Sequence, residues 1–424
     1  MKKFIWLLIA MAFLASGCGG EDTALQLPED YRRAEVELSE KMNVDVYFDA
    51  TVSMKGYTTL AVGNVYRTLP DLLTDIGSSM GEVKFFAFGE NVRELSGREY
   101  RQFNSPAPYV ELITAVHNVI DKTDTSHLSI IVTDLFESDA DWSNISKKIR
   151  EKFFANHLAV AVIGIRSSFS GEIFDVGLNA AKFQYDSYDY PYRFRPFYLL
   201  IMGSELSVKD FMVRFKERQT LPNDTGYLLL SENLSEVSND FSKMNLQTME
   251  NFFANDKLDL ADKTVREFGV DKMREPASFT VDFKYAPPPG ACRLDMSQMK
   301  ADIKIFTFNE GEWEQLPTQN AEMTLTPVEG EENNYTVRFE ILPEESLRDG
   351  QINFVHAELS PTEKGYLMPE WVRKWNMPNV DVDPANFDGS KTINLIHVIG
   401  SLKDSVLAAA HPALVNLNFV VDVR

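Results

Sequence analysis

Residues 44–56 constrain the fold of this chain more than any other segment. Val44 to Phe48 is rich in β-branched and aromatic residues, which is typical of a buried β-strand. Asp49 follows this strand directly, and the hydroxyl residues Thr51 and Ser53 follow at alternate positions. In an open α/β sheet, ligands bind beyond the carboxyl ends of the strands, where these side chains are expected. Carboxylate and hydroxyl oxygens suit Mg²⁺ or Mn²⁺, with Ca²⁺ as an alternative.

A second apolar segment ends in the same way. Ser129 to Thr133 predicts a strand, and Asp134 follows it. The first segment, Asp49-x-Thr51-x-Ser53-Met54-x-Gly56, resembles the metal-ion-dependent adhesion site of von Willebrand factor type A domains, whose usual motif has Ser where this chain has Thr51. Thr133-Asp134 is similar to the Thr-Asp-Gly of the same family, with Leu135 in place of the glycine. The resemblance covers about residues 43–220.

The resemblance implies that the protein binds a partner and is not an enzyme. Asp49, Thr51, Ser53 and Asp134 would hold Mg²⁺ directly or through water, and an acidic side chain of a partner protein would complete the shell. The family also supplies a Thr from the loop before the next helix, which is expected here at about residues 109–120. Ser105 is the one hydroxyl residue in the loop 103–108 and is therefore the candidate for that position.

Three alternatives remain open from the sequence. Acids and hydroxyl residues after a strand also cap the following helix, without any ligand. Asp-x-Thr after an apolar strand also resembles the nucleophile loop of haloacid-dehalogenase-type phosphatases, in which Asp49 would attack phosphorus with Mg²⁺ bound. The segment Asp49-Ala50-Thr51, however, lacks the second Asp of the commoner phosphatase form. Finally, the domain could be a degenerate, metal-free scaffold.

The beginning of the chain has the pattern of an export signal. Lys2 and Lys3 precede an apolar run from Phe4 to Leu14, which is too short to span a membrane. Leu14-Ala15-Ser16-Gly17-Cys18 resembles the lipobox of bacterial lipoproteins, although an ordinary signal peptide is the alternative. The resemblance implies a signal peptide at residues 1–17, a Cys18 that carries acyl chains such as palmitate, and a tether at 18–42. Gly19 is not the Asp of inner-membrane retention, which favours an anchor in the outer membrane of the cell envelope, periplasmic or surface-exposed.

Charge and cysteine content exclude several classes of function. The formal net charge of -21 is unsuited to nucleic acid, because phosphate binding requires a basic face. The membrane is expected to be contacted through the lipid anchor alone, since no later stretch has the apolar length of a span. The two cysteines are Cys18 and Cys292, so acylation of Cys18 leaves Cys292 without a disulfide partner, as a small core residue. The sequence contains no phosphate-binding Gly-rich loop and no zinc spacing.

Residues 43–230 alternate apolar strands with amphipathic helices. This pattern predicts an α/β domain with a doubly wound, Rossmann-like parallel sheet, and right-handed crossovers would bring Asp49 and Asp134 to one sheet edge. The expected strands are 44–48, 83–88, 128–134, 158–165 and 197–203, and the expected helices are 58–80, 109–120, 142–154 and 207–218.

The remainder of the chain has a different composition. Residues 231–275 are polar and predict a helical bridge. Residues 276–424 predict a β-rich, sandwich-like domain, because strands with alternating polarity are separated by Pro-rich and Gly-rich turns. The expected strands are 279–285, 303–308, 323–328, 335–341, 352–359 and 415–423, with a helix at 393–410.

Two groups of aromatic residues require an explanation. The segment 183–198 combines tyrosines with acids and arginines, and we interpret it as an elaborated hairpin that leads into a buried strand; a recognition surface is the alternative. Trp371 and Trp375 share one helix face and are expected to pack against the neighbouring domain.

Overall fold

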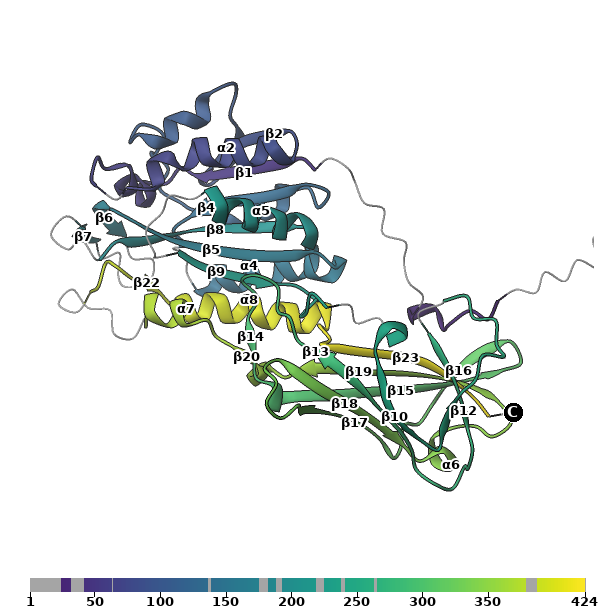
Figure 1. Cartoon of the computed structure of the whole chain (residues 1–424). Helices are drawn as coiled ribbons and strands as arrows, with labels where there is room; N and C mark the ends of the chain where they lie inside the picture. The colour runs from purple at the N-terminus through teal and green to yellow at the C-terminus, as the bar shows by residue number, and fades with distance from the viewer. Residues whose placement is uncertain are drawn as a thin grey trace, which may run out of the picture.

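The computed structural model is a mixed α/β protein with an α/β unit and a β-rich unit (Figure 1). It describes residues 24–31, 42–62, 64–135, 139–174, 182–187, 193–218, 225–237, 241–262, 265–378 and 387–423. The predicted signal peptide and Cys18 lie outside these residues. Within the described ranges, no helix is both long and apolar enough to cross a membrane.

The α/β unit is built on a mixed seven-stranded sheet. Its central strands β1, β2 and β4 run parallel to one another, as the sequence predicts. In sheet order, the strands are β3 (Val92–Glu94), β2 (Val83–Phe88), β1 (Val44–Asp49), β4 (Leu128–Thr133), β8 (Arg195–Gly203), β5 (Ala159–Ser167) and β9 (Thr225–Leu230).

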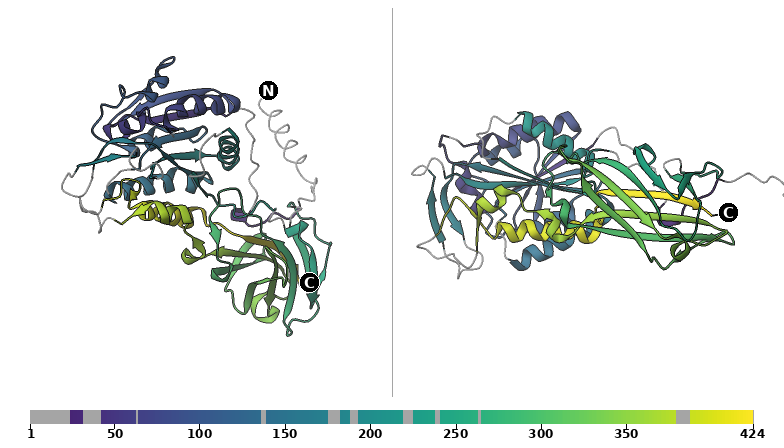
Figure 2. Two further views of the ribbon diagram at one scale, coloured as in Figure 1. Left: turned by 60° about the vertical axis from the view of Figure 1, so that its left-hand side comes forward. Right: turned by 60° about the horizontal axis from the view of Figure 1, so that its bottom comes forward.

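Helices cover both faces of this sheet (Figure 2). Alternate residues of β1 face opposite sides: Val46 packs in one core with α2 and α5, and Tyr47 packs in the other with α3, α4 and α8. Burial on both faces explains why β4 and β8 are apolar along nearly their whole length. The helices are α2 (Leu69–Met80), α3 (Val116–Lys122), α4 (Asp139–Lys152), α5 (Glu205–Arg218) and α8 (Leu395–Ala410).

The prediction of an all-parallel, doubly wound sheet is wrong at β8. This strand runs antiparallel between β4 and β5. A small hairpin, β6 (Ser170–Phe174) with β7 (Lys182–Asp186), connects β5 to β8 in place of a helix. Parallel neighbours need a long crossover, usually a helix, whereas a hairpin returns the chain antiparallel. The described part of the aromatic segment agrees with our interpretation, because β7 belongs to the hairpin and β8 is buried; residues 188–192 lie outside the described ranges.

Two predicted helices begin later than expected. The helix predicted at 109–120 begins at Val116, and residues 109–115 form a loop. The helix predicted at 58–80 is divided into the 3-10 helices η2 (Val52–Thr58) and η3 (Tyr66–Thr68), followed by α2. The apolar residues Leu60 and Val62 that suggested a longer helix are 81% and 95% exposed. Both residues lie on a surface loop and not on one face of a helix.

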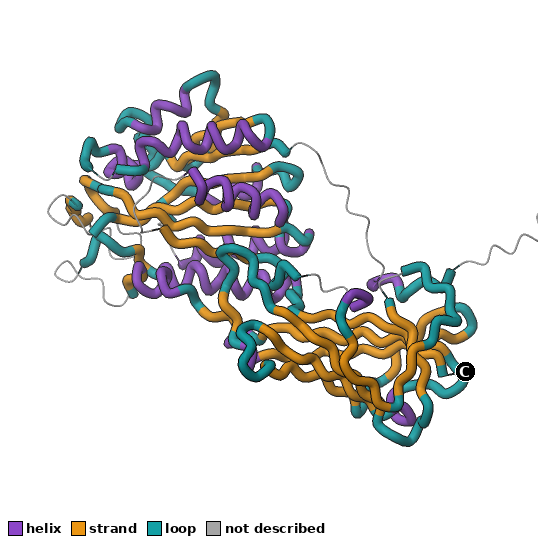
Figure 3. The backbone as a smooth tube through the Cα atoms, viewed as in Figure 1, coloured by secondary structure: helices purple, strands orange, loops and turns teal. Residues whose placement is uncertain are grey.

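The β-rich unit consists of two main sheets, one of four strands and one of six (Figure 3). The four-stranded sheet, in order, is β10 (Leu246–Glu250), β13 (Ala277–Lys284), β18 (Asn334–Ile341) and β17 (Ala321–Pro327). The six-stranded sheet is β11 (Phe252–Ala254), β12 (Arg266–Val270), β23 (Val415–Asp422), β19 (Ile352–Pro361), β15 (Met299–Asn309) and β16 (Glu312–Leu316). The predicted strands of this region are therefore confirmed.

Short elements complete the chain. The two-stranded pairs are β14 (Arg293–Leu294) with β20 (Tyr366–Leu367) and β21 (Asn376–Met377) with β22 (Thr392–Ile393). The remaining helices are α6 (Pro343–Ser346), α7 (Glu370–Trp375), η1 (Glu29–Tyr31), η4 (Glu99–Asn104), η5 (Phe154–Asn156), η6 (Phe241–Lys243), η7 (Met296–Gln298) and η8 (Glu363–Gly365).

The prediction of a helical bridge at 231–275 is wrong. Its described residues contain β10, β11 and β12, which pair with strands of the β-rich unit. Phe252 and Phe268 pack there with Phe279 and Phe419, in the core between the sheets. Cys292 is a buried core residue, as predicted, and it forms no disulfide among the described residues.

The C-terminal part of the chain returns to the α/β unit before it ends in β23. Helix α8 packs against α4, and Ser405 Oγ donates to the Ser146 carbonyl. Trp371 and Trp375 of α7 lie over the glycines of β5 and β9: a Cβ built on Gly226 would come 2.3 Å from the Trp371 ring. This contact confirms that the two tryptophans pack against the neighbouring unit. The α/β unit is therefore completed by residues that follow most of the β-rich unit in sequence.

Candidate metal centre

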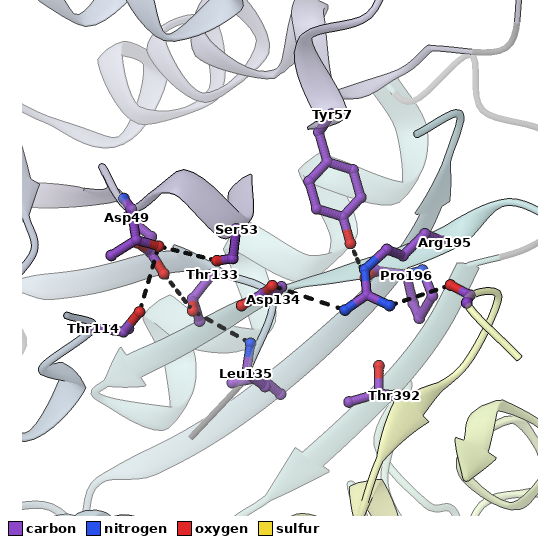
Figure 4. A network of polar contacts seen from close by, with 12 residues as sticks. Asp49, Ser53, Tyr57, Thr114, Thr133, Asp134, Leu135, Arg195, Pro196 and Thr392 are labelled. Carbon is purple, nitrogen blue, oxygen red and sulfur yellow. Dashed lines mark hydrogen bonds and ion pairs between the residues drawn. The ribbon is translucent and has the colours of Figure 1, made fainter. Parts of the chain in front are cut away.

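The two strand-end acids of the sequence motif lie at the same edge of the sheet. Asp49 is the last residue of β1, and β1 pairs in parallel with β4 through Phe48 and Val132. Asp134 directly follows the last residue of β4, Thr133. Both carboxylates are buried, with exposed fractions of 0% for Asp49 and 1% for Asp134. Figure 4 shows the polar network that surrounds them.

Asp49 is held by three hydrogen bonds. Its Oδ1 accepts from the Thr51 backbone N at 2.9 Å and from Thr51 Oγ1 at 2.6 Å. Its Oδ2 accepts from Thr133 Oγ1 at 3.0 Å. Because the Thr51 hydroxyl gives its hydrogen to Asp49, its oxygen can act toward other groups only as an acceptor or a ligand. The carboxylate thus orients the hydroxyls around it.

Three hydroxyl groups from two loops meet beside this carboxylate. Thr51 Oγ1 lies 3.0 Å from Ser53 Oγ, and Thr114 Oγ1 donates to Thr51 Oγ1 at 3.4 Å. The loops are joined by backbone bonds: Val52 N donates to the Glu111 carbonyl, and Glu111 N donates to the Ala50 carbonyl. This ladder positions the loop before α3 against the loop after β1.

The prediction of Ser105 as a site residue is wrong. Ser105 Oγ bonds its own loop, at the Gln102 carbonyl, in an exposed position. Thr114 takes the place that we assigned to Ser105, because the loop is longer than predicted and α3 begins only at Val116. The sequence does contain a signal for Thr114, because it is a hydroxyl residue just before an apolar helical pattern. A predicted helix start at residue 109 places Thr114 inside the helix and hides this signal. Of the remaining predicted residues, Thr51 bonds Asp49 and lies beside Ser53. Figure 4 shows Asp134 close to Asp49 and Ser53.

Leu135 keeps the backbone conformation that a glycine would favour. Its φ is 57°, in the left-handed region, although its side chain is buried. L-residues with a Cβ pay about 1–2 kcal/mol in this region. Leu135 N donates to Thr133 Oγ1 at 3.3 Å, so the strained turn helps to orient the Thr133 hydroxyl toward Asp49.

Asp134 lies beside a buried arginine. Arg195 Nη2 is 3.9 Å from Asp134 Oδ2, and the Arg195 side chain is 2% exposed. Arg195 is the first residue of β8, the strand that runs antiparallel to β4. Sequence reasoning missed this residue, because the expected parallel direction would place the start of β8 at the other edge of the sheet.

The site concentrates negative charge away from water. Burial, and then the neighbouring Asp134 carboxylate, raise the pKa of Asp49 well above its ordinary value, while the hydrogen bonds from Thr51 and Thr133 act in the opposite direction. A buried carboxyl with a raised pKa is stabilised in its charged form by a nearby cation.

The donor set fits a small, hard cation. In an octahedral shell with Mg–O distances of about 2.1 Å, neighbouring ligand oxygens lie about 3 Å apart. The distance of 3.0 Å between Thr51 Oγ1 and Ser53 Oγ agrees with this spacing, and 3.4 Å to Thr114 Oγ1 is close to it. Among the described residues, no three His, Cys, Asp or Glu side chains gather as a metal site. A cation here would therefore depend on hydroxyl oxygens as well as on two carboxylates.

No protein-family model matches the chain, and no curated protein matches it. The interpretation of the site therefore depends on its geometry.

Proposed function

We propose that this protein is a lipid-anchored binding or scaffold protein of the bacterial cell envelope, and that its α/β unit binds an acidic protein partner through Mg²⁺. The observation that carries this proposal is the meeting of Asp49, Thr51, Ser53 and Thr114 at one point, with Asp134 at the end of the neighbouring strand. When bound, Mg²⁺ supplies an open coordination position for a partner carboxylate, and Mn²⁺ and Ca²⁺ are alternative ions.

The chain's own residues have distinct roles in this proposal. Thr51 and Ser53 present hydroxyl oxygens directly, and Thr114 presents a third from the neighbouring loop. Asp49 orients Thr51 by accepting its hydrogen, and Thr133 fixes the other oxygen of Asp49. Asp134 contributes a second carboxylate from β4. The buried carboxylates favour a cation, although the protein as a whole is acidic and would repel an acidic ligand elsewhere.

We also propose that the α/β unit is a divergent von Willebrand factor type A domain. The strand order β3-β2-β1-β4 with an antiparallel β3, the hydroxyl from the loop before α3 and the glycine-like turn at Leu135 support this assignment. Two features set the chain apart: the antiparallel β8 lies between β4 and β5, and the last helix, α8, follows the β-rich unit.

Exposed aliphatic side chains beside the site favour a protein partner. Val110, Leu112 and Ile113 are 69%, 81% and 56% exposed, and they directly precede Thr114. Clustered apolar residues on a surface commonly mark sites of protein–protein contact. A catalytic pocket would instead enclose its substrate. The partner surface that fits this site is a carboxylate with apolar side chains next to it.

The geometry of Asp49 argues against the phosphatase alternative. A nucleophilic aspartate must present an oxygen that the phosphorus atom of the substrate can approach. Both oxygens of Asp49 accept hydrogen bonds from Thr51 and Thr133, and the side chain is fully buried. We therefore place binding ahead of catalysis.

A metal-free scaffold is the second candidate function, and Arg195 favours it. Its guanidinium already supplies a positive charge to Asp134. In this alternative, the two strand ends are held by hydrogen bonds and by this ion pair, and the α/β unit binds its partner without a cation.

The described N-terminal residues support an anchor next to the β-rich unit. Leu27 is buried against Phe354 and Val420, and Trp313 Nε1 donates to the Gln26 carbonyl. The segment 24–31 therefore docks on the six-stranded sheet and lies far from the ends of β1 and β4 (Figure 1). With an acyl chain on Cys18, the β-rich unit would lie nearest the membrane, and the metal site would face away from it.

Thermal unfolding in the presence of metal tests the proposal. The full chain in detergent would be heated with Mg²⁺, Mn²⁺, Ca²⁺ or a chelator, and compared with Asp49→Ala. A ligand that binds only the native state at one hundred times its Kd stabilises it by about 2.7 kcal/mol. We expect such a rise for the wild type and none for Asp49→Ala. Equal unfolding temperatures with metal and chelator would favour the metal-free scaffold.

A further inference from the structure

Arg195 connects the candidate metal site to a distant part of the chain. On one side, its Nη2 lies 3.9 Å from Asp134 Oδ2. On the other side, its Nη1 donates to the Gly389 carbonyl at 3.2 Å and to the Lys391 carbonyl at 3.4 Å. Its Nε has no hydrogen-bond partner among the described residues, and its Cζ lies 5.5 Å from the centre of the Phe169 ring. One buried guanidinium is therefore shared between the site and residues 389–391 (Figure 4).

Residues 387–394, here called the return segment, lead the chain back from α7 into α8. Phe387 stacks on Phe183 of β7 at 4.1 Å between ring centres. Thr392 Oγ1 lies 2.7 Å from Tyr198 OH, and Asn394 N donates to the Met377 carbonyl. Helix α8 begins at the next residue, Leu395. The hydrogen bonds from Arg195 to two carbonyls of this segment therefore lie just before α8, the helix that packs on the α/β unit.

The charges at the site place Arg195 in competition with a cation. Asp49 and Asp134 carry two carboxylates, and Arg195 supplies one positive charge at Asp134. A divalent cation on the same donors would share Asp134 with the guanidinium. Two positive groups that approach one carboxylate in a buried site repel each other strongly, because little water screens them.

We propose that Arg195 competes with the metal for Asp134. We propose further that this competition couples cation binding to the hydrogen bonds between Arg195 and the return segment. This inference rests on the proposed function as a metal-binding domain. A bound cation draws Asp134 away from Arg195. The guanidinium is then held less firmly, and its hydrogen bonds to the Gly389 and Lys391 carbonyls become weaker. Coupling between two sites is reciprocal. The factor by which metal binding weakens the contact between Arg195 and the return segment is therefore the factor by which this contact weakens metal binding.

Metal titration of Arg195 variants tests the competition. The probe is Mg²⁺ alone, or Mn²⁺ alone, titrated calorimetrically into the full chain in detergent. Arg195→Met keeps the length of the side chain and removes its charge, and we expect it to bind Mg²⁺ at least about tenfold more tightly than the wild type, since a nearby like charge is lost. Arg195→Lys keeps the charge, and we expect an affinity close to that of the wild type.

A matched control separates this effect from the loss of any arginine that bonds backbone carbonyls. Arg266 of β12 also donates to backbone carbonyls, of Phe241 and Ser242, and also lies over an aromatic ring, but it belongs to the β-rich unit. Arg266→Met should leave the Mg²⁺ affinity unchanged. If Arg195→Met does not fold, Arg195→Gln removes the same charge and retains a donor for the carbonyls.

Hydrogen exchange tests the coupling itself. We expect backbone amides of residues 389–393 to exchange several-fold faster in the wild type when Mg²⁺ is added, and the amides of β1 to exchange no faster. Unchanged exchange in the return segment would overturn the coupling, even if Arg195→Met binds Mg²⁺ more tightly.

The titration also separates this inference from the proposed function. If the wild type binds Mg²⁺ and Arg195→Met binds no more tightly, the competition is overturned while the metal site stands. If the wild type binds none and Arg195→Met binds, the competition is supported, and the natural protein is the metal-free scaffold. If neither binds Mg²⁺, both the metal site and the competition are overturned.

Discussion

Thr114 donates a hydrogen bond of 3.4 Å to the hydroxyl of Thr51 across 63 positions of sequence. This contact unites the loop after β1 with the loop before α3, and it brings a third hydroxyl to the two that the motif supplies. It also places the exposed aliphatic residues Val110, Leu112 and Ile113 beside the site.

Removal of the Thr114 hydroxyl should weaken metal binding. Thr114→Val keeps the shape of the side chain and deletes the oxygen, so we expect Mg²⁺ affinity to fall about tenfold, as it does when a group that supports a metal site is lost. Calorimetric titration measures this change. Ser105→Ala is the control, because Ser105 bonds only its own loop in the described contacts and should leave the affinity unchanged. If Ser105→Ala weakened Mg²⁺ binding and Thr114→Val did not, Ser105 and not Thr114 would be the site residue.

The turn at Leu135 should prefer glycine to alanine. Leu135→Ala loses a buried side chain, at about 2–5 kcal/mol of unfolding free energy. Leu135→Gly loses the same side chain but relieves the left-handed strain, so it should be more stable than Leu135→Ala by about 1 kcal/mol. Denaturant unfolding of both variants decides this. At Leu73, inside α2, the order should be reversed, because glycine is the poorer helix former by about 1 kcal/mol. Equal stability of the two Leu135 variants would contradict the strain.

Without metal, Asp49 should make the stability of the protein fall as pH rises. Its folded pKa is raised by burial and by Asp134, whereas its unfolded pKa is ordinary, at about 3.9. Between these two pKa values the folded state holds the extra proton, so stability decreases with rising pH and then levels off. Asp49→Asn lacks this titration. Its stability relative to the wild type should therefore increase from acidic to neutral pH, as measured by thermal unfolding in metal-free buffer.

The control for this pH dependence is the same pair of proteins in the presence of Mg²⁺. Addition of Mg²⁺ should reverse the trend for the wild type alone, because the cation stabilises the charged form of Asp49. A pH-independent difference for Asp49→Asn would mean that Asp49 stays ionised in the folded protein.

The contact between Gly226 and Trp371 should behave as a coupled pair. Gly226→Ala introduces a Cβ 2.3 Å from the indole ring, and overpacking of this kind costs about 1–3 kcal/mol. In a Trp371→Ala background the cost should largely disappear, which gives a coupling energy of about 1–3 kcal/mol in a double-mutant cycle of unfolding free energies. Gly400→Ala, in α8 with open space around it, should show no coupling to Trp371. Additive effects at Gly226 would mean that α7 does not rest on β9.

The sequence predicted the elements whose signal is local. Val44 to Asp49 and Leu128 to Thr133 read as buried strands, because burial on both faces of the sheet demands apolar residues along their length. The sequence also indicates Asp49, Thr51, Ser53 and Asp134 as candidate site residues, because each lies within a few residues of a strand end. The alternating strands of the β-rich unit were equally visible, because one face of each strand packs into the core.

The tertiary structure decided every relationship that joins distant segments. The direction of β8 depends on the hairpin before it, and this direction alone places Arg195 beside Asp134. Thr114 reaches Thr51 through backbone bonds between two loops, which leave no periodic pattern in either loop. Helix α8 completes the α/β unit because its apolar face packs against α4. The sequence pattern does not specify this neighbour. Local periodicity records whether a residue is buried, but the identity of its neighbours is fixed only when the whole chain packs.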